Sequence, residues 1–241
     1  MKLAYFVVLF ILCSPGLNAQ KANYRALKDS LFKAGLKYLP IERQVELEQC
    51  YDTSNGNVKD FLLLSCCYQH SSKKELIENI DNNSNNITLL KNEFGKLIPA
   101  NHVVSIEYNP ADSIWDQKES FNISIVKNTN GTKTFYQEWN LEPKGAKLKK
   151  VLKSLNWSNE TLEKIKSLLK NANCISVDND EIVTIGFARS GMGLYSFKLF
   201  KTALSPEEII KFNDHCLYIF YKNNIVLEYG GGAVGNQCFP D

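Results

Sequence analysis

Residues 121–139, FNISIVKNTNGTKTFYQEW, decide the fold class of this chain. Phe121, Ile123 and Ile125 alternate with polar residues, and this two-residue period is typical of a half-buried β-strand. The turn residues NTNG (128–131) then lead into a second strand-like run, TKTFYQEW (132–139). The stretch therefore predicts a β-hairpin, which is built from antiparallel strands.

The rest of the chain repeats this antiparallel pattern and adds helices. Apolar periodicity predicts a helical stretch over 22–69 and a short helix over 72–80. Further strands are expected at 102–108, 181–188, 194–200, 216–222 and 225–229, and further helices at 148–155, 162–172 and 205–212. We therefore expect an α+β fold, with a helical N-terminal portion followed by an antiparallel sheet with flanking helices.

The polar stretch DNNSNN (81–86) lacks apolar anchors and is rich in turn-forming residues. It is the expected linker between a helical portion over 20–80 and an α+β portion over 87–241. Before both portions, residues 1–19 have the pattern of a secretory signal peptide, with Lys2 ahead of an apolar run and cleavage after Ala19. We thus expect an exported protein, periplasmic or secreted. Lipid attachment at Cys13 is the alternative, although Leu12 is larger than the residue such processing prefers.

Composition narrows the classes of partner. The 241 residues are 44% hydrophobic, which suffices for a substantial core. Their 28 basic and 26 acidic residues give a formal charge of only +2, so no overall field favours nucleic acid. No segment of the mature chain is apolar for long enough to span a membrane. A partner, whether a protein or a small ligand, must be recognised locally.

Six cysteines remain once the predicted signal peptide is removed, and an even number in an exported chain favours disulfides. They are Cys50, Cys66, Cys67, Cys174, Cys216 and Cys238. Six cysteines allow 15 connectivities, which the sequence does not distinguish. The preferred pair is Cys216 with Cys238, because closing a loop of that length contributes roughly 3 kcal/mol.

Glycines near the C-terminus raise the question of a phosphate site. A dinucleotide or P-loop motif needs a helix after its glycines, and the segment GGGAVGNQCFPD (230–241) ends too soon for one. The glycines favour a sharp turn at the end of a hairpin. A second glycine-containing turn, RSGMG (189–193), offers a cation beside exposed backbone donors. The tentative ligand-binding residues are Arg189, Ser190, Gly191, Gly193, Gly230, Gly231 and Gly232.

Catalytic and metal motifs are incomplete. His215 adjoins Cys216, as a thiolate–imidazole pair would require, but neighbours on a strand point to opposite faces. Cys66 and His70 are four residues apart and could share a helix face, but the sequence offers no second pair of metal ligands at a suitable spacing. The acidic run DNDE (178–181) lacks the later positions of a calcium loop, and the lysines of 144–153 are typical of a solvated helix face. Five carboxylates remain as candidates for a hydrolytic pair in space, namely Glu107, Asp112, Asp116, Glu119 and Glu138.

No catalytic residue, metal or cofactor is assigned from these patterns. The expected function is a non-catalytic binding or interaction module, with an inhibitor or immunity-type protein as one form of it. The alternative is an extracytoplasmic hydrolase whose site is assembled from distant residues. A large exposed apolar patch favours a protein partner, whereas a deep pocket lined by carboxylates favours the hydrolase.

Overall fold

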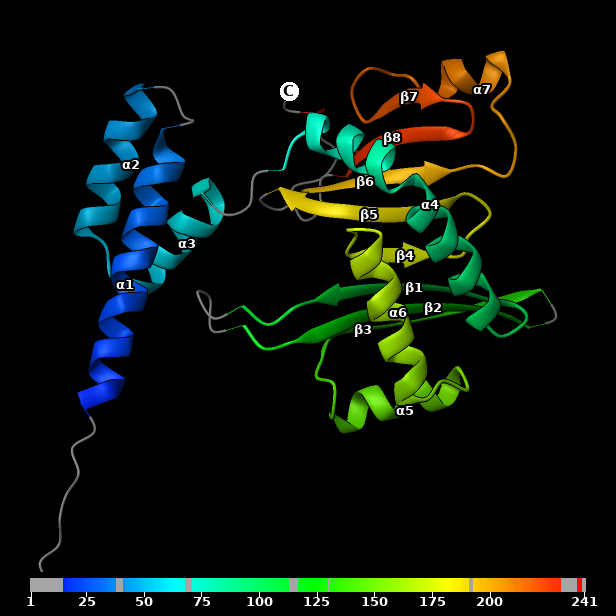
Figure 1. Cartoon of the computed structure of the whole chain (residues 1–241), viewed down its shortest axis with the longest axis horizontal. Coiled ribbons are helices and arrows are strands. Elements are labelled where there is room, and N and C mark those ends of the chain that lie inside the picture. The colour runs from blue at the N-terminus through cyan, green and yellow to red at the C-terminus, as the bar shows by residue number, and fades with distance from the viewer. Residues whose placement is uncertain are drawn as a thin grey trace, which may run out of the picture. The chain divides into compact units, whose positions relative to one another are not determined.

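The structure is a computed structural model that describes residues 15–37, 41–67, 71–112, 117–129, 131–190, 193–230 and 238–239. The side chains of 15–23, 64–67 and 190 are outside the described set, as is Cys13. The chain divides into two compact units, Met1–Cys67 and Tyr68–Asp241, which are described separately (Figure 1).

The first unit is helical, as predicted. It contains α1 (Pro15–Leu36), α2 (Ile41–Thr53) and α3 (Gly56–Cys67). The ring of Phe32 on α1 stacks on that of Tyr51 on α2, with centroids 3.8 Å apart, and the Tyr51 hydroxyl donates a 2.8 Å hydrogen bond to Asp29. Burial of the ring and this hydrogen bond both raise the pKa of Tyr51. The stacked pair therefore forms a small core with a satisfied polar edge.

The second unit is built on an eight-stranded antiparallel sheet, so the α+β prediction is confirmed. The strands are β1 (His102–Asn109), β2 (Ser120–Thr129), β3 (Thr132–Leu141), β4 (Ser176–Asp178), β5 (Val183–Ser190), β6 (Gly193–Leu199), β7 (Tyr218–Lys222) and β8 (Ile225–Gly230). Their order across the sheet is β3-β2-β1-β4-β5-β6-β8-β7. The hairpin that decides the fold class thus supplies β2 and the edge strand β3.

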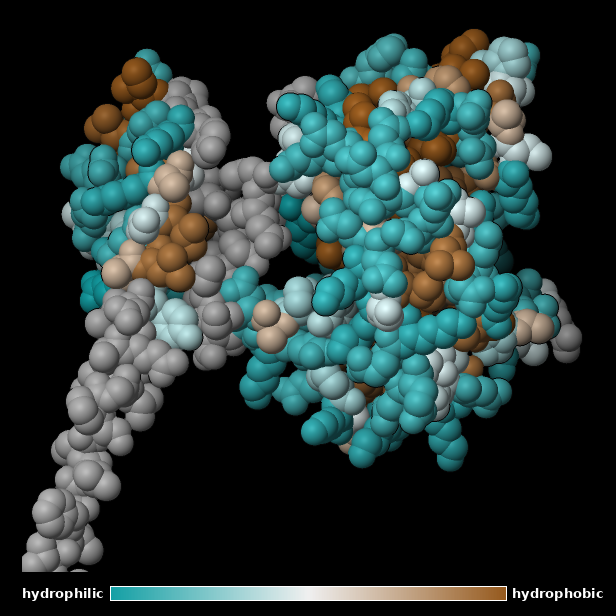
Figure 2. All heavy atoms as spheres, viewed as in Figure 1, coloured by the Kyte–Doolittle hydropathy of each residue, from teal (hydrophilic) through white to brown (hydrophobic). Residues whose placement is uncertain are grey.

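One face of the sheet, here called the helical face, carries the main core. The helices α4 (Lys73–Leu97), α5 (Ala146–Ser154) and α6 (Asn159–Asn171) lie over it (Figure 1). Serine caps begin three helices of this unit: the side chains of Ser72, Ser158 and Ser205 accept a hydrogen bond from the main-chain N–H of the third helical residue. Figure 2 shows that the outside of this helical layer is mostly hydrophilic, with smaller hydrophobic areas among the helices.

The predicted linker at 81–86 is wrong, because these residues lie inside α4. Ile80, Ile87, Leu90 and Phe94 recur at helical spacing and are all buried, so the packed face continues through the polar run. Burial of this face outweighs the weak helix propensity of asparagine. The only trace of that propensity is a kink at Asn83, where the backbone leaves helical values.

The opposite face, here called the open face, is covered by helix at one end alone as far as the described residues go. There α7 (Pro206–Lys211) and its flanking residues pack on Val226, which points away from the helical face because its neighbour Leu227 belongs to the main core. Phe200 and Leu204 complete this small second cluster. Toward β3 the side chains of the open face are mainly polar, and this region holds the candidate site.

Candidate binding surface

A chain of hydrogen bonds crosses the open face over four strands. Arg189 on β5 donates from Nε (2.8 Å) and Nη2 (2.5 Å) to Oε1 of Glu107 on β1. The other oxygen of Glu107 accepts from Asn122 on β2 at 3.1 Å, and Asn122 Oδ1 accepts the main-chain N–H of Asn140 on β3 at 2.9 Å. Glu107 is only 9% exposed. These four residues are here called the polar chain. Their hydrogen bonds hold the side chains in place across this part of the open face.

A second polar cluster lies further along the same face. Ser196 on β6 donates a 2.8 Å hydrogen bond to Glu228 on β8, and Lys198 forms an ion pair with the same carboxylate at 3.3 Å. The Lys198 ammonium also lies 5.8 Å from the ring centroid of Tyr218 on β7. Because each charge already has a partner, this cluster supports the sheet rather than presenting a free charge.

The edge strand β3 carries large exposed aromatic side chains. Phe135 is 67% exposed and Trp139 is 56% exposed. Phe135 pairs with Val126, whose neighbour Ile125 is in the main core, so Phe135 lies on the open face. Tyr136, 44% exposed, points to the helical face. These three rings were not selected from the sequence, although the run TFYQEW contains them; their significance depends on the edge position of β3.

The main chain of β3 is also available along one side. In the described part of the molecule β3 pairs with β2 alone. Thr129 and Thr132 flank a two-residue turn and pair directly, so residues 132, 134 and 136 exchange main-chain hydrogen bonds with β2. The alternate residues Lys133, Phe135 and Gln137 direct their N–H and C=O groups to the free edge.

The structure brings several of the predicted ligand-binding residues to one end of the sheet. Leu194 on β6 pairs with Arg189 on one side and with Gly230 on the other, and Gly193 pairs with Ser190. The remaining predicted residues, Gly191, Gly231 and Gly232, and the side chain of Ser190 lie outside the described set. A ligand site here stays a prediction.

Two observations give these residues structural roles as well. The guanidinium of Arg189 is held by Glu107, which neutralises much of the charge expected to attract an anion. At Gly193 a Cβ atom would collide with the Tyr229 ring and hydroxyl. This glycine therefore makes room for the Tyr229 side chain on the neighbouring strand, a requirement independent of any ligand.

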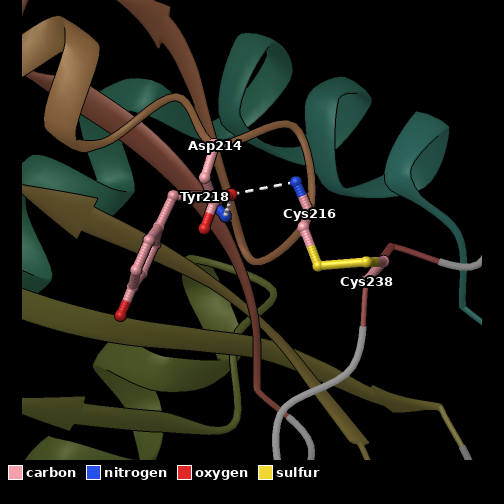
Figure 3. The surroundings of a disulfide bond; sticks show 4 residues. All are labelled: Asp214, Cys216, Tyr218 and Cys238. Carbon is pink, nitrogen blue, oxygen red and sulfur yellow. Dashed lines mark hydrogen bonds between the residues drawn. A yellow bond between two sulfur atoms is a disulfide. The ribbon is translucent and has the colours of Figure 1, made fainter.

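The preferred disulfide, Cys216–Cys238, is confirmed (Figure 3). Asp214 holds the turn before β7 by accepting the main-chain N–H groups of Cys216 at 2.9 Å and Tyr218 at 2.8 Å. Burial opposes ionisation of Asp214, but these hydrogen bonds outweigh it and hold its pKa below the ordinary value. The N–H of Phe239 also donates to the Cys216 carbonyl at 2.9 Å, so the chain near the C-terminus is tied to the sheet.

Two other predicted disulfide cysteines are free thiols, which corrects the expectation of complete pairing. Cys50 is exposed and Cys174 is buried. The Cys174 thiol donates to the Ala172 carbonyl at 3.3 Å and accepts from Asn79 at 3.7 Å. Cys174 therefore fills a core position as a small apolar side chain, and its weak S–H donor has a hydrogen-bond acceptor there. The side chains of Cys66 and Cys67 are outside the described set.

Three of the five candidate carboxylates are each paired with a cation. Glu107 pairs with Arg189, Glu119 with Lys166, and Glu138 with Lys147. Glu107 and Glu138 lie on opposite faces of the sheet, since Glu107 neighbours buried Ile106 whereas Glu138 pairs with buried Ile123. A shared hydrolytic pair is thus not formed by these two. Asp112 forms an isolated bridge with Gln117, and Asp116 is outside the described residues.

The histidine and metal candidates among the described residues have structural roles. His215 and Cys216 precede β7 rather than beginning it, and Cys216 is oxidised in the disulfide. Asp178 accepts the main-chain N–H groups of Asp180 and Thr184, as an acidic turn does. No group of three or more metal-binding side chains occurs in the part of the chain that the structure describes. His70 lies outside that part.

Among the described helices, none combines the length and apolar character that a membrane span requires. Comparisons of the chain with protein-family models, with curated proteins and with solved structures found no match.

Proposed function

We propose that this protein is a non-catalytic binding module that holds an extended segment of a partner protein along the edge strand β3. The observation that carries the proposal is the exposure of Phe135 and Trp139 beside the free edge of the sheet. Large aromatic side chains with few rotatable bonds are the residues that most often dominate the energetics of protein interfaces.

The ten-residue length of β3 supports strand addition as the binding mode. Proteins commonly blunt an edge strand by keeping it short or by placing charges and proline on it, because a long free edge pairs with other chains. β3 is long and, although it contains Lys133 and Glu138, it carries aromatics on both of its faces, with Phe135 on the open face and Tyr136 on the helical face. An added strand would gain main-chain hydrogen bonds from the edge and apolar contacts from these rings.

The polar chain supports the same mode by fixing the neighbouring strands. Asn122 binds the main chain of Asn140 and links it to Glu107 and Arg189. The end of β3 is therefore anchored to the sheet before a partner arrives, which lowers the entropy cost of binding. The exposed aromatics and the fixed edge together favour a polypeptide over a small ligand on this surface.

The proposal can be tested with ten-residue peptides selected from a displayed random library on residues 20–241. We expect Phe135→Ser and Trp139→Ser each to weaken the selected peptide by about ten- to thirtyfold, the usual loss at an aromatic hot spot. Gln137→Pro removes a donor from the free edge without removing a bond to β2, and should cost about fivefold.

A matched control is Ile210→Ser, because Ile210 on α7 is 78% exposed and lies away from β3. This variant should bind as the unaltered protein does. Selected peptides that bind all four variants equally, or a selection that yields no peptide, would contradict the proposal.

Export to the periplasm or the medium is the second part of the proposal. It is supported by the signal-like pattern of residues 1–19 and by the Cys216–Cys238 disulfide, which is typical of oxidising compartments. The intact mass of the protein recovered from the producing cells should correspond to a chain that begins at Gln20. A chain retained in the cytosol with its first 19 residues would overturn this part while leaving the binding surface untouched.

A further inference from the structure

A separate cleft of about 410 Å³ lies on the helical face, between α5 and the strands β1, β2 and β3. Its size falls within the range of small-molecule sites in proteins. The cleft is distinct from the exposed rings of Phe135 and Trp139, because neither residue lines it and Phe135 lies on the other face of the sheet.

The floor of this cleft consists of a row of side chains across three strands. His102 on β1 pairs directly with Lys127 on β2, and Lys127 pairs with Thr134 on β3. The next row toward the core contains Ile125 and Tyr136, which also pair directly. Side chains directly opposite one another on a sheet face lie within contact distance, so a basic row adjoins an apolar row.

Helix α5 forms the other wall of the cleft. Its residues Lys150, Val151 and Ser154 line the space. Val151 is buried and continues the apolar surface, and the Ser154 hydroxyl is occupied by a 2.7 Å hydrogen bond to the Val151 carbonyl. The cleft therefore has an apolar interior with basic groups around it.

All ionisable groups of the lining except the tyrosine hydroxyl are basic. Neither Lys127 nor Lys150 forms an ion pair with any described carboxylate. His102 donates from Nδ1 to the Ala100 carbonyl at 2.8 Å, which fixes the ring. The Tyr136 hydroxyl is engaged with Glu138 at 3.1 Å, and that carboxylate in turn faces Lys147 on α5. The lysines of the cleft are thus available to an external anion.

From this arrangement we propose that the cleft binds a small carboxylate with an apolar body, either an aromatic ring or a short alkyl chain. The carboxylate would lie between Lys127 and Lys150, where two cations favour a negative charge. The apolar body would pack against Ile125, Val151 and the Tyr136 ring, which contribute through removal of apolar surface from water.

The proposal is tested by titrating octanoate and 2-naphthoate into ¹⁵N-labelled protein of residues 20–241 and following amide shifts. Saturable shifts are expected at His102, Lys127 and the 150–154 turn of α5. The uncharged analogues octanamide and 2-naphthamide should bind at least about fivefold more weakly, since they lack the ion pairs.

Variants distinguish binding in the cleft from binding elsewhere on the protein. Lys127→Gln and Lys150→Gln should each weaken octanoate about three- to fivefold, whereas Lys149→Gln, an exposed lysine on the same helix outside the cleft, should have no effect. Thr134→Trp should block the cleft. The Trp139→Ser variant should bind octanoate normally, because Trp139 does not line the cleft.

Three results would overturn the proposal. They are equal binding of carboxylates and amides, equal loss of octanoate binding in Lys149→Gln and Lys150→Gln, and an absence of saturable shifts at millimolar probe. The spectra of the free variants show whether each one is folded, so a loss of binding through unfolding is recognised.

Discussion

The guanidinium of Arg189 and the carboxylate of Glu107 form a two-pronged contact across the short strand β4, although 82 residues separate them in the chain. Both prongs end on the same oxygen, Oε1, which leaves Oε2 to accept from Asn122. This contact joins the two sides of the sheet on the open face, where no helix does so in the described residues.

Replacing Glu107 tests the importance of that contact. Glu107→Gln should lower the free energy of unfolding by about 1–2 kcal/mol, because a nearly buried charge-assisted pair is replaced by a neutral one while Arg189 stays partly solvated. Chemical denaturation gives the value. The exposed pair of Lys118 and Glu142 supplies the control, in which Glu142→Gln should change stability by less than about 0.5 kcal/mol. Similar losses in the two variants would show that Glu107 is no special anchor.

Asn79 is a second internal anchor, this time on the helical side. Its amide donates to the carbonyls of Ala172 and Asn173 and accepts from Asn83, while its side chain is buried. Asn79→Ala should cost about 1–3 kcal/mol, because the buried Ala172 carbonyl and the partly buried Asn173 carbonyl lose their donor. Asn85→Ala, on the exposed side of the same helix, should be nearly neutral in thermal unfolding. A neutral Asn79→Ala would contradict the proposed bridge.

The sequence predicted those parts of the fold that depend on residues close together in the chain, and it failed where distant packing decides the structure. The hairpin over 121–139 and the serine caps were predictable because alternation and capping depend on residues close in the chain. The asparagines of 81–86 have a local preference for turns, which favoured a linker. Their helical state depends on Ile87, Leu90 and Phe94 packing against distant elements, and tertiary burial outweighs local propensity.

The candidate surface was less predictable for a related reason. Arg189 was selected from its turn, but its partner Glu107 becomes its neighbour only through the strand order. The aromatics of TFYQEW were visible in the sequence. Nothing local shows that β3 is an edge strand or that its Phe135 face is left uncovered, and these two features of the fold together expose the ring.

Thiol chemistry offers a third prediction. Burial raises the pKa of Cys174 to about 12, and a hydrogen bond from Asn79 opposes this only in part. Since the thiolate is the reactive form, iodoacetamide at pH 8 should modify exposed Cys50 in the folded protein and spare Cys174. Peptide mapping after labelling gives the result, with guanidinium-unfolded protein as the control in which both react. Cys174 found in a disulfide, or labelled as fast as Cys50, would contradict the structure.

Acid sensitivity gives a fourth prediction. Hydrogen bonds from Lys164 (2.7 Å) and Lys96 (2.6 Å) lower the pKa of Glu93 from 4.5 to about 2. A carboxyl with a depressed pKa stabilises the fold above its unfolded pKa, and that contribution is lost as the pH falls through the folded value. Glu93→Gln should therefore be less stable than the unaltered protein at pH 6, and the difference should shrink between pH 4.5 and pH 2.

The control for this pH series is Glu78→Gln, because Glu78 forms only a long, exposed ion pair with Lys74 at 3.8 Å. Its stability difference should be small at every pH. A Glu93→Gln difference that stays constant from pH 6 to pH 2 would mean that the pairs with Lys164 and Lys96 do not stabilise the fold.

Hydrogen exchange at single amides of β3 tests the proposed function most directly. In the free protein the amides of Thr134 and Tyr136 should be protected by β2, whereas those of Lys133, Phe135 and Gln137 should exchange rapidly. Adding a peptide selected on the protein should slow exchange at Lys133, Phe135 and Gln137 by at least about tenfold. A peptide that binds with unchanged exchange at these three amides would contradict strand addition at β3.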